Sequence, residues 1–368
     1  MTAVIPVVSR LSSTPQPFPS LHFERSLLFI MKLRVGLIGL GATWENCYRP
    51  ALHALADRFE VRAVCSEVSA RTERVAQEFN AVALDGFQVL TRRPDIDAVL
   101  LLAPGWYGSL PIYATCTAGK GLFCATDLHA EPNQSQEVRR RIEQSGIAFM
   151  SELPRRQAPA TLRLKELIAT KLGDPELVFC QLRQTRNALG ETSGQHAHPT
   201  SMFRDLVELV DWCCYVVDQR PSSVTGLRHE VSTNPNDRDY RLVNLDFSPH
   251  HQPGTGPAAQ ISCGRYLSAT WRDALSFRRP AELQVCCAHG VAFVDFPNTL
   301  TWFDDAGQHL ESLDTDRVVG EQMLIQFHRS VTSLVRKTDA LENTFRSLDI
   351  VEASEESFRT GQRVMLNS

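Results

Sequence analysis

The sequence predicts a two-domain protein: first an α/β domain with a doubly wound parallel sheet, then an α+β domain with a large, open, mostly antiparallel sheet. Between Leu33 and Leu52 a short apolar run is followed by a glycine turn and a helical pattern. Strands and helices then alternate as far as Ser151, which is typical of a parallel sheet with crossover helices. After Pro159 extended segments follow one another, separated by polar loops, which favours antiparallel pairing. The predicted boundaries are an N-terminal segment of residues 1–30, a first domain of residues 31–152 and a second domain of residues 153–368.

The glycine turn organises the first domain. Leu33–Ile38 is a short apolar run typical of a buried strand, and Gly39 and Gly41 end it. In a dinucleotide-binding (Rossmann) unit the first glycine allows the tight turn, and the second lets backbone approach a pyrophosphate at the helix N-terminus. Trp44 holds the third glycine position of G-x-G-x-x-G, so we expect the helix to begin later or to stand further from the strand.

The remaining elements are predicted from apolar periodicity and from glycine and proline breaks. In the first domain we expect strands at 61–65, 81–84, 96–102, 122–124 and 147–150, and helices at 70–79, 110–118 and 131–144. In the second domain we expect helices at 160–171, 202–217, 317–336 and 341–363, and strands at 177–183, 223–231, 240–247, 259–271, 282–287, 291–296 and 300–303. The last two helices could pack back on the first domain.

Composition and charge exclude several classes of protein. The 368 residues are 43% hydrophobic and 22% charged, which fits a globular chain, and the net charge of −4 gives no reason to expect nucleic acid or an anionic membrane as partner. No apolar run approaches the roughly 20 residues that span a bilayer. The ten cysteines are scattered without C-x-x-C spacing, which is typical of reduced thiols, so we expect a cytoplasmic protein.

Residues 1–30 are not expected to belong to the fold. The segment SSTPQPFPS has little periodicity, and the apolar patches around it are too short for a secretory signal. Met31 directly precedes the first strand, as a start codon would. The segment is therefore either a disordered tail or lies before the true start, and we expect a chain beginning at Met31 to fold equally well.

Four segments carry a resemblance to a known family. They are VGLIGLG (35–41), IDAVLLLAP (96–104), AGKGLFC (118–124) and SGIAFMSELPRRQAPATLRLKELI (145–168). In order, spacing and type they resemble the glucose–fructose oxidoreductase and inositol dehydrogenase family (Gfo/Idh/MocA). The resemblance implies a Rossmann domain followed by an α+β domain, with NAD or NADP as cofactor and a small polyol, sugar or related carbonyl compound as substrate.

The chain departs from that family at three polar motifs. Where the family usually has Glu-Lys-Pro, with a lysine that contacts nicotinamide ribose and substrate, this chain has Ala125, Thr126 and Asp127. Where the family has an acid/base histidine three residues before an aspartate, this chain has Glu208 before Asp211. The family's Pro-Asn and following histidine are replaced by Pro-Gly-Trp-Tyr-Gly at 104–108, whose aromatic residues could flank the nicotinamide or belong to the core.

Oxidation of an alcohol needs a group that takes the hydroxyl proton, with a pKa near the working pH. Glu208 could do so if burial raised its pKa, with Asp127 and His129 as partners on a neighbouring loop and Asp211 on the same helix. In the structural alternative, Glu208 and Asp211 cap a loop or pair with Arg204, and Asp127 is a helix N-cap. Both interpretations remain open.

The residues expected around the cofactor lie in the glycine turn and at the ends of later strands. They are Gly39, Gly41, Ala42, Thr43, Trp44, Ser66, Glu67, Arg71, Ala103, Pro104, Tyr107 and Thr126. Ser66 stands where an acid would hold the ribose 2′-OH of NAD, and Arg71 and Arg74 follow it, which admits the phosphate of NADP. Glu67, one residue on, argues for NAD instead, so the sequence leaves the choice open.

No metal is expected. His196 and His198 form H-x-H in a polar loop that could meet Glu208, but a third ligand at diagnostic spacing is missing, which favours a solvated loop.

Two classes of function follow. The first is an NAD(P)-dependent oxidoreductase of a small-molecule substrate. The alternative is a catalytically degenerate nucleotide-binding or regulatory protein on the same fold. We expect a homo-oligomer, most simply a dimer through the C-terminal sheet, because residues 241–247 alternate and leave a second face of that sheet to be covered.

Overall fold

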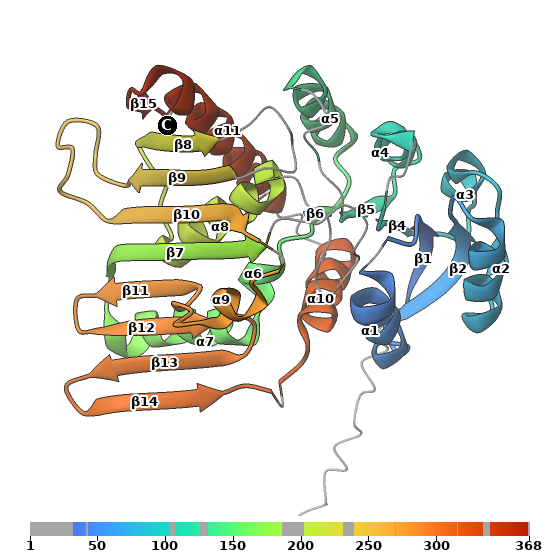
Figure 1. Ribbon diagram of the computed structural model, residues 1–368. Helices are drawn as coiled ribbons and strands as arrows, with labels where there is room; N and C mark the ends of the chain where they lie inside the picture. The colour runs from blue at the N-terminus through green and yellow to red at the C-terminus, as the bar shows by residue number, and fades with distance from the viewer. Residues whose placement is uncertain are drawn as a thin grey trace, which may run out of the picture. The chain divides into compact units, whose positions relative to one another are not determined.

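The computed structural model describes residues 32–41, 43–103, 107–125, 128, 132–185, 202–230, 239–268, 270–314, 316–333 and 339–366. The chain divides into two units, Met1–Met31 and Lys32–Ser368. The first unit lies outside the described residues, so the elements below belong to the second (Figure 1).

The N-terminal domain contains the predicted doubly wound parallel sheet. Its strands are β1 (Leu33–Ile38), β2 (Phe59–Cys65), β3 (Val82–Ala83), β4 (Ala98–Leu101), β5 (Gly121–Cys124) and β6 (Phe149–Ser151). They pair in parallel in the order β3-β2-β1-β4-β5-β6. The order reverses between β1 and β4, and the carboxyl ends of strands on either side of such a point form the usual ligand crevice of this fold.

Helices connect these strands much as the apolar pattern predicts. They are the π-helix η1 (Trp44–Tyr48), α1 (Arg49–Ala54), α2 (Ser69–Glu78), α3 (Phe87–Arg92), α4 (Leu110–Thr117) and α5 (Pro132–Ser145). The short α3 was not predicted, because six residues are too few to establish a helical period. All four residues of β4 are buried, as expected of a central strand covered on both faces.

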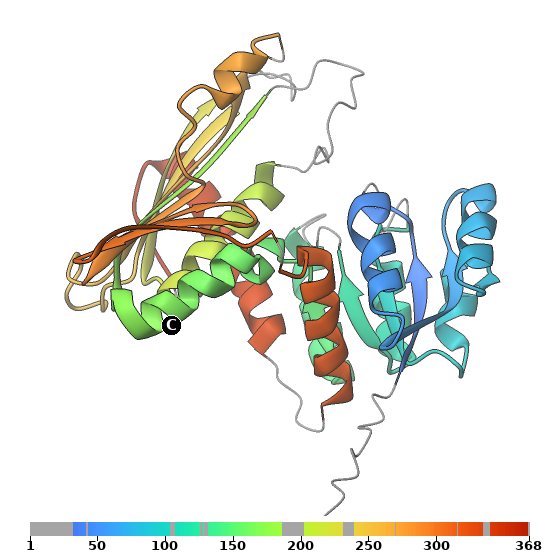
Figure 2. The ribbon, with the colours of Figure 1, turned by 90° about the horizontal axis from the view of Figure 1, so that it is seen from below.

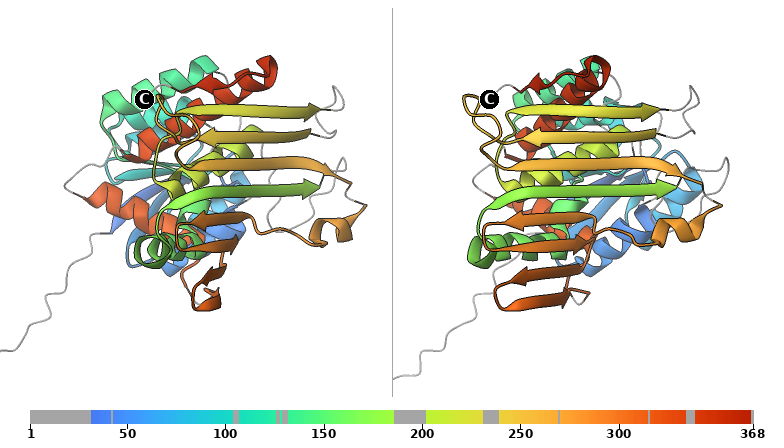
Figure 3. Two further views of the ribbon diagram at one scale, coloured as in Figure 1. Left: turned by 90° about the vertical axis from the view of Figure 1, so that its left-hand side faces the viewer. Right: turned by 60° about the vertical axis from the view of Figure 1, so that its left-hand side comes forward.

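The C-terminal domain contains a nine-stranded, mostly antiparallel sheet. Its strands are β7 (Pro175–Thr185), β8 (Ser223–Glu230), β9 (Asp239–Asp246), β10 (Ala258–Leu267), β11 (Leu283–Cys287), β12 (Gly290–Asp295), β13 (Thr299–Asp304), β14 (Gly307–Ser312) and β15 (Val364–Met365). The order is β14-β13-β12-β11-β7-β10-β9-β8-β15, and the central strands β7 and β10 pair in parallel. Figure 3 shows one face of this sheet with none of the drawn helices lying over it.

The helices of this part of the chain cover the other face or pack on the first domain. They are α6 (Pro154–Gln157), α7 (Pro159–Leu167), the π-helix η3 (Ile168–Leu172), α8 (Met202–Val217), α9 (Arg272–Ser276), α10 (Val319–Thr332) and α11 (Asp339–Thr360). Helix α8 packs on β7 and β10, α7 on β12 and β13, and α11 on β8 (Figure 2). Helix α10 instead packs on α1 and β6, and Met323 and Phe327 belong to the core of the first domain.

Among the described residues, no helix is long and apolar enough to cross a membrane.

Candidate functional site

The glycine turn lies at the carboxyl end of β1 and is packed tightly against the end of β4. Gly39 has a φ of +72°, and a Cβ on it would lie 1.9 Å from the carbonyl oxygen of Ala103. A Cβ on Gly41 would lie 3.0 Å from the carbonyl oxygen of Leu102. Both positions therefore need glycine, the first for its conformation and both for the close approach of backbone.

The helix that follows the turn has an unusually wide first turn. A π-helix, η1, begins at Trp44 itself, and the α-helix α1 begins later, at Arg49. The indole is fully buried and meets the ring of Phe79 edge-on at 6.0 Å between centroids. Trp44 is thus a core residue of the first domain, and its side chain is not placed to touch a cofactor.

The residues of the turn fit a pyrophosphate. Thr43 precedes η1 and makes no side-chain capping bond, and the N–H of Trp44 donates to the carbonyl oxygen of Gly41, 3.1 Å away. Free N–H groups at a helix N-terminus, beside backbone without side chains, form a site for a phosphate.

The end of β2 presents Ser66, whose hydroxyl lies 2.6 Å from the Thr72 hydroxyl. Arg71 reaches back to the turn and donates to the carbonyl oxygens of Leu40 and Gly41. Glu67 is exposed at the same strand end. Serine, glutamate and arginine side chains therefore gather where the cofactor's ribose is expected.

Tyr107 approaches this place from the loop after β4. Its ring meets Phe87 edge-on at 4.9 Å, and its hydroxyl bonds to the thiol of Cys65 at the end of β2. Burial raises the pKa of Tyr107, and the neighbouring Cys65 and Glu67 raise it further. Tyr107 therefore borders the end of β2, where the cofactor's ribose is expected. The backbone of Ala103 packs against Gly39 of the glycine turn.

Glu208 lies on α8 among charged residues from several elements. Its carboxylate is 3.4 Å from Nε of Arg204 and 4.0 Å from Nε of Arg155, and 19% of its side chain is exposed. Burial raises the pKa of Glu208 to about 7, against the lowering effects of Arg204 and Arg155. The pairing with Arg204 is the one anticipated by the structural alternative, and burial nevertheless places the pKa of the carboxyl group near neutral pH.

Arg204 also bonds beyond its own helix. Its guanidinium binds the carboxylate of Glu152, the residue after β6, and donates to the carbonyl oxygen of Ala125, 3.3 Å away, just after β5. Glu152 accepts a second hydrogen bond from the hydroxyl of Tyr48, at the end of η1. Glu208 is therefore connected to the strand ends of the parallel sheet.

Arg155 is the second arginine beside the carboxylate of Glu208. It forms an ion pair of 2.7 Å with Glu282 and packs between the rings of Trp212 and Phe296, each 5.0 Å from the guanidinium carbon. Its Nε is buried and has no hydrogen-bond partner within the part of the chain that the structure describes.

Asp211 has a different environment from Glu208. It is 1% exposed, binds the guanidinium of Arg156 through both oxygens and accepts a hydrogen bond from Ser347 of α11. Burial raises its pKa and Arg156 opposes the rise. Asp211 therefore joins α8 to α6 and α11, and the prediction of a catalytic role for it is not supported by its surroundings.

Five predicted site residues lie outside the described residues: Ala42, Pro104, Thr126, Asp127 and His129. The same holds for His196 and His198. Among the residues that are described, no group of three histidine, cysteine or acidic side chains could hold a metal ion.

The sequence analysis missed Tyr48, Glu152 and Arg155 as site residues. Glu152 directly follows a predicted strand at the carboxyl edge of a parallel sheet, and that position alone could have indicated it. Tyr48 and Arg155 carry no such signal, because their partners lie 104 and 127 residues away in sequence.

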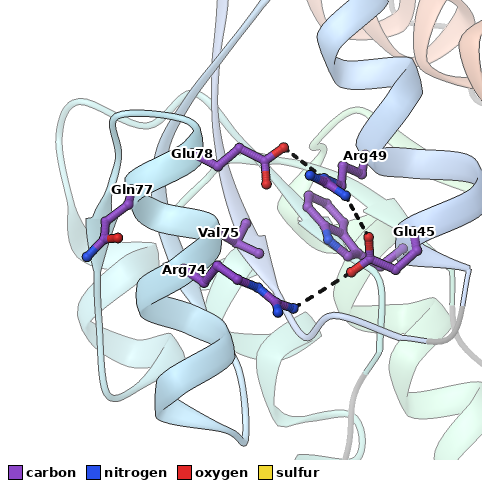
Figure 4. A pocket seen from close by; sticks show the side chains of 7 residues that line it. Glu45, Arg49, Arg74, Val75, Gln77 and Glu78 are labelled. Carbon is purple, nitrogen blue, oxygen red and sulfur yellow. Dashed lines mark hydrogen bonds and ion pairs between the residues drawn. The ribbon is translucent and has the colours of Figure 1, made fainter.

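A surface hollow of about 720 Å³ lies between η1, α1 and α2, and Figure 4 shows the side chains that line it. Its charged groups pair with one another: Arg49 with Glu78 at 2.7 Å and with Glu45 at 2.9 Å, and Arg74 with Glu45 at 4.0 Å. The lining of the hollow comes from η1, α1 and α2, and its charged groups are already paired, so we do not assign it to the site.

Comparison with known proteins supports a dinucleotide-binding fold for the N-terminal domain. Residues 33–153 match the model of an oxidoreductase family with an NAD-binding Rossmann fold, GFO_IDH_MocA. A D-xylose 1-dehydrogenase (NADP(+)) of Haloferax volcanii is 27% identical over 139 residues, which is 38% of this chain and 42% of that protein. A dTDP-3,4-didehydro-2,6-dideoxy-alpha-D-glucose 3-reductase of Saccharopolyspora spinosa is 40% identical over 76 residues, 20% of this chain and 23% of that protein. The matches thus span less than half of either relative.

The likeness of fold extends over most of the chain. The structure of an aldose-aldose oxidoreductase from Caulobacter crescentus superposes with a TM-score of 0.73, covering 91% of this chain and 100% of the other. Sequence identity is 13%, so this comparison shows the fold alone.

Proposed function

We propose that this chain, whose residues 33–153 match the Gfo/Idh/MocA family of NAD-binding Rossmann-fold oxidoreductases, oxidises or reduces a small polyol, sugar or related carbonyl compound. The two curated relatives are named for reactions of sugars, which supports this class of substrate. The single observation that carries the proposal is a carboxyl group with a pKa near neutrality, Glu208, joined by hydrogen bonds to the strand ends of the parallel sheet.

Glu208 would act as the general base. A carboxylate with a pKa of about 7 can take a hydroxyl proton at neutral pH and return it in the reverse direction. Arg204 and Arg155 flank the carboxylate and would stabilise the negative charge that develops on the substrate oxygen as the proton leaves. A bound nicotinamide would supply the hydride acceptor or donor. Gly39, Gly41 and the N-terminus of η1 would hold the pyrophosphate.

NADP is the cofactor that we propose. Ser66 stands at the end of β2 where NAD-binding sites commonly carry an acid, and Arg71 and Arg74 follow on α2. The side chain of Arg74 is 70% exposed and its one described ion pair, with Glu45, is 4.0 Å long, so it can turn toward a 2′-phosphate at little cost. The relative from Haloferax volcanii is named for NADP(+), which agrees with this choice.

A binding or regulatory protein remains the second candidate. The pairing of Glu208 with Arg204, together with the departures from the family at 125–127 and 208, favours it. The test is a fluorescence titration of the purified protein with NADPH and NADH, followed by turnover assays with polyols, sugars and their oxidised forms. An enzyme binds one cofactor and turns over at least one substrate class. Binding without turnover across the panel would favour the second candidate.

A further inference from the structure

The strongest unassigned feature is the chain of hydrogen bonds that runs from the helix of the glycine turn to Glu208. Tyr48 ends η1 and donates its hydroxyl to Oε1 of Glu152. Oε2 of Glu152 accepts from Nη2 of Arg204, and Nε of Arg204 lies 3.4 Å from Oε1 of Glu208. Three contacts therefore connect the element that would hold the pyrophosphate to the proposed base.

These groups are sheltered from solvent. Tyr48 is fully buried, and the side chains of Glu152 and Arg204 are 10% and 19% exposed. Burial and the adjacent Glu152 raise the pKa of Tyr48 well above its ordinary value, so its hydroxyl stays protonated and donates. In such an environment, charge–charge interactions act at greater strength than on the surface.

Arg204 is shared between two carboxylates. A shift of its guanidinium toward Glu152 weakens its attraction for the charged form of Glu208, and a shift toward Glu208 strengthens it. We propose that Tyr48 and Glu152 position Arg204 against Glu208, so that a ligand seated on the glycine turn is coupled to the binding of a proton by Glu208. This inference rests on the proposed function, in which the turn binds a dinucleotide and Glu208 is the base.

Other charged groups around Glu208 also affect its pKa. Arg155 from α6 attracts its charged form, and Asp205 from its own helix repels it. Arg155 is paired with Glu282, which precedes β11, and Asp205 with Arg265 of β10, so each acts with a counter-charge beside it. The charge of Glu152 raises the pKa of Glu208.

The direction of coupling follows from these contacts. A pyrophosphate on the turn fixes η1 and strengthens the bond from Tyr48 to Glu152. Glu152 then attracts Arg204 less strongly. Arg204 therefore pairs more fully with Glu208 and lowers the pKa of that carboxyl group. Binding is therefore accompanied by the release of a fraction of a proton, with a maximum near pH 7.

The experiment is calorimetric titration with ADP-ribose and with its 2′-phosphorylated form, in phosphate and in imidazole buffer at pH 7. Neither ligand carries a nicotinamide, so the charge of that ring does not contribute. A binding enthalpy that depends on the buffer measures the protons released. Subtracting the same measurement on Glu208→Gln removes protons from any other source, including the 2′-phosphate.

We expect wild type to release a proton fraction that Glu208→Gln does not, and that disappears at pH 9, where Glu208 is already charged. Tyr48→Phe should bind the ligand but lose most of this release. Glu152→Gln, a second variant in case Tyr48→Phe does not fold, should move the maximum to a pH below 7. Tyr240→Phe, which removes a hydroxyl on β9 that bonds to Ser262, is the matched control and should resemble wild type.

Binding without proton release in wild type would overturn the coupling and leave the proposed function intact. Release that persists in Glu208→Gln, or that is unchanged in both Tyr48→Phe and Glu152→Gln, would overturn it as well. If neither ligand binds, the nucleotide site itself is wrong, and the proposed function fails together with the coupling.

Discussion

Glu152 and Arg204 form an ion pair between the residue that follows β6 of the parallel sheet and helix α8 of the second domain. Both side chains are mostly buried, so removal of one partner leaves the other charge poorly solvated. The pair holds α8 against the carboxyl end of the parallel sheet, and Glu208 lies one helical turn after Arg204 on the same helix. The proposed base is therefore oriented by a contact that joins the two domains.

Glu208→Gln should lower turnover by about 10²-fold or more while cofactor binding persists, because the amide keeps the shape of the side chain and cannot accept a proton. Steady-state kinetics and a cofactor titration measure the two effects separately. Glu166→Gln is a matched control: it makes the same change on α7, where 62% of the side chain is exposed. Full activity in Glu208→Gln would remove Glu208 as the base.

The pH dependence of stability tests the same residue without an assay of activity. Burial raises the pKa of Glu208 from 4.5 to about 7, so between these pH values the folded chain holds a proton that the unfolded chain has released. The contribution of Glu208 to the free energy of unfolding therefore falls as pH rises from 4.5 to 7, by up to about 3 kcal/mol. Urea unfolding at pH 5 and pH 8 should show a larger loss for wild type than for Glu208→Gln. Equal losses would contradict a raised pKa.

Much of the fold could be predicted, because local pattern decides it. The apolar period of residues 202–217 marks α8 at the bounds that the structure has, and the uninterrupted run at 98–101 marks a central strand. Strand β14 was missed because Gly307–Ser312 is a mostly polar, partly exposed edge strand without a clear apolar face. The parallel pairing of β7 with β10 could not be foreseen, since it joins segments about 80 residues apart through no local signal.

The site was less predictable than the fold. Glu208 was identified from its place on a helix, but its pKa is raised by burial and by the charge of Glu152 and lowered by Arg204 and Arg155, and Glu152 and Arg155 come from other elements. Asp211 occupies an equivalent place one turn later, and only the structure reveals its buried pair with Arg156. Sequence pattern thus indicated candidates, and the contacts that separate their roles are long-range.

Gly41→Val should abolish binding of the dinucleotide. A Cβ at this position already lies 3.0 Å from the carbonyl oxygen of Leu102, and the two methyl groups of valine would occupy the space that the pyrophosphate needs. Gly86→Val makes the same substitution in the same domain, where the nearest atom, Oε1 of Gln88, is 3.5 Å from an added Cβ, and binding should persist. Comparison of the melting temperatures of both variants separates loss of binding from loss of folding. Unchanged affinity in Gly41→Val would mean that the pyrophosphate is not bound at this turn.

Ser66→Asp should reverse the choice of cofactor. An aspartate at the end of β2 can accept a hydrogen bond from a ribose 2′-OH and repels a 2′-phosphate. Wild type is expected to bind 2′,5′-ADP more tightly than 5′-ADP, and the variant to lose or invert that ratio. Ser69→Asp adds the same charge three residues later, at the start of α2, and should change the ratio less. A wild type that prefers 5′-ADP would show that Glu67 selects NAD instead.

The open face of the nine-stranded sheet should form a symmetric dimer. In β9, Val243 and Leu245 are buried, so Leu242, which directly precedes Val243, belongs to the opposite face of the sheet. Register places Leu227 beside Leu242 on that face. Leu227 is 55% exposed, and Leu177, on the central strand β7, is 46% exposed. Three leucine side chains on one sheet face favour association with a second copy of the chain. A two-fold axis would pair this face with the same face of the second copy.

Leu177→Glu should convert the dimer to a monomer, because a dimer would bury the new charge without a partner. Light scattering at micromolar concentration measures the mass of both forms. Val89→Glu is the control: Val89 is 57% exposed on α3 of the first domain, and the substitution should leave the dimer intact. A monomeric wild type would refute the prediction. A dimer that survives Leu177→Glu and Leu227→Glu would place the interface on another surface.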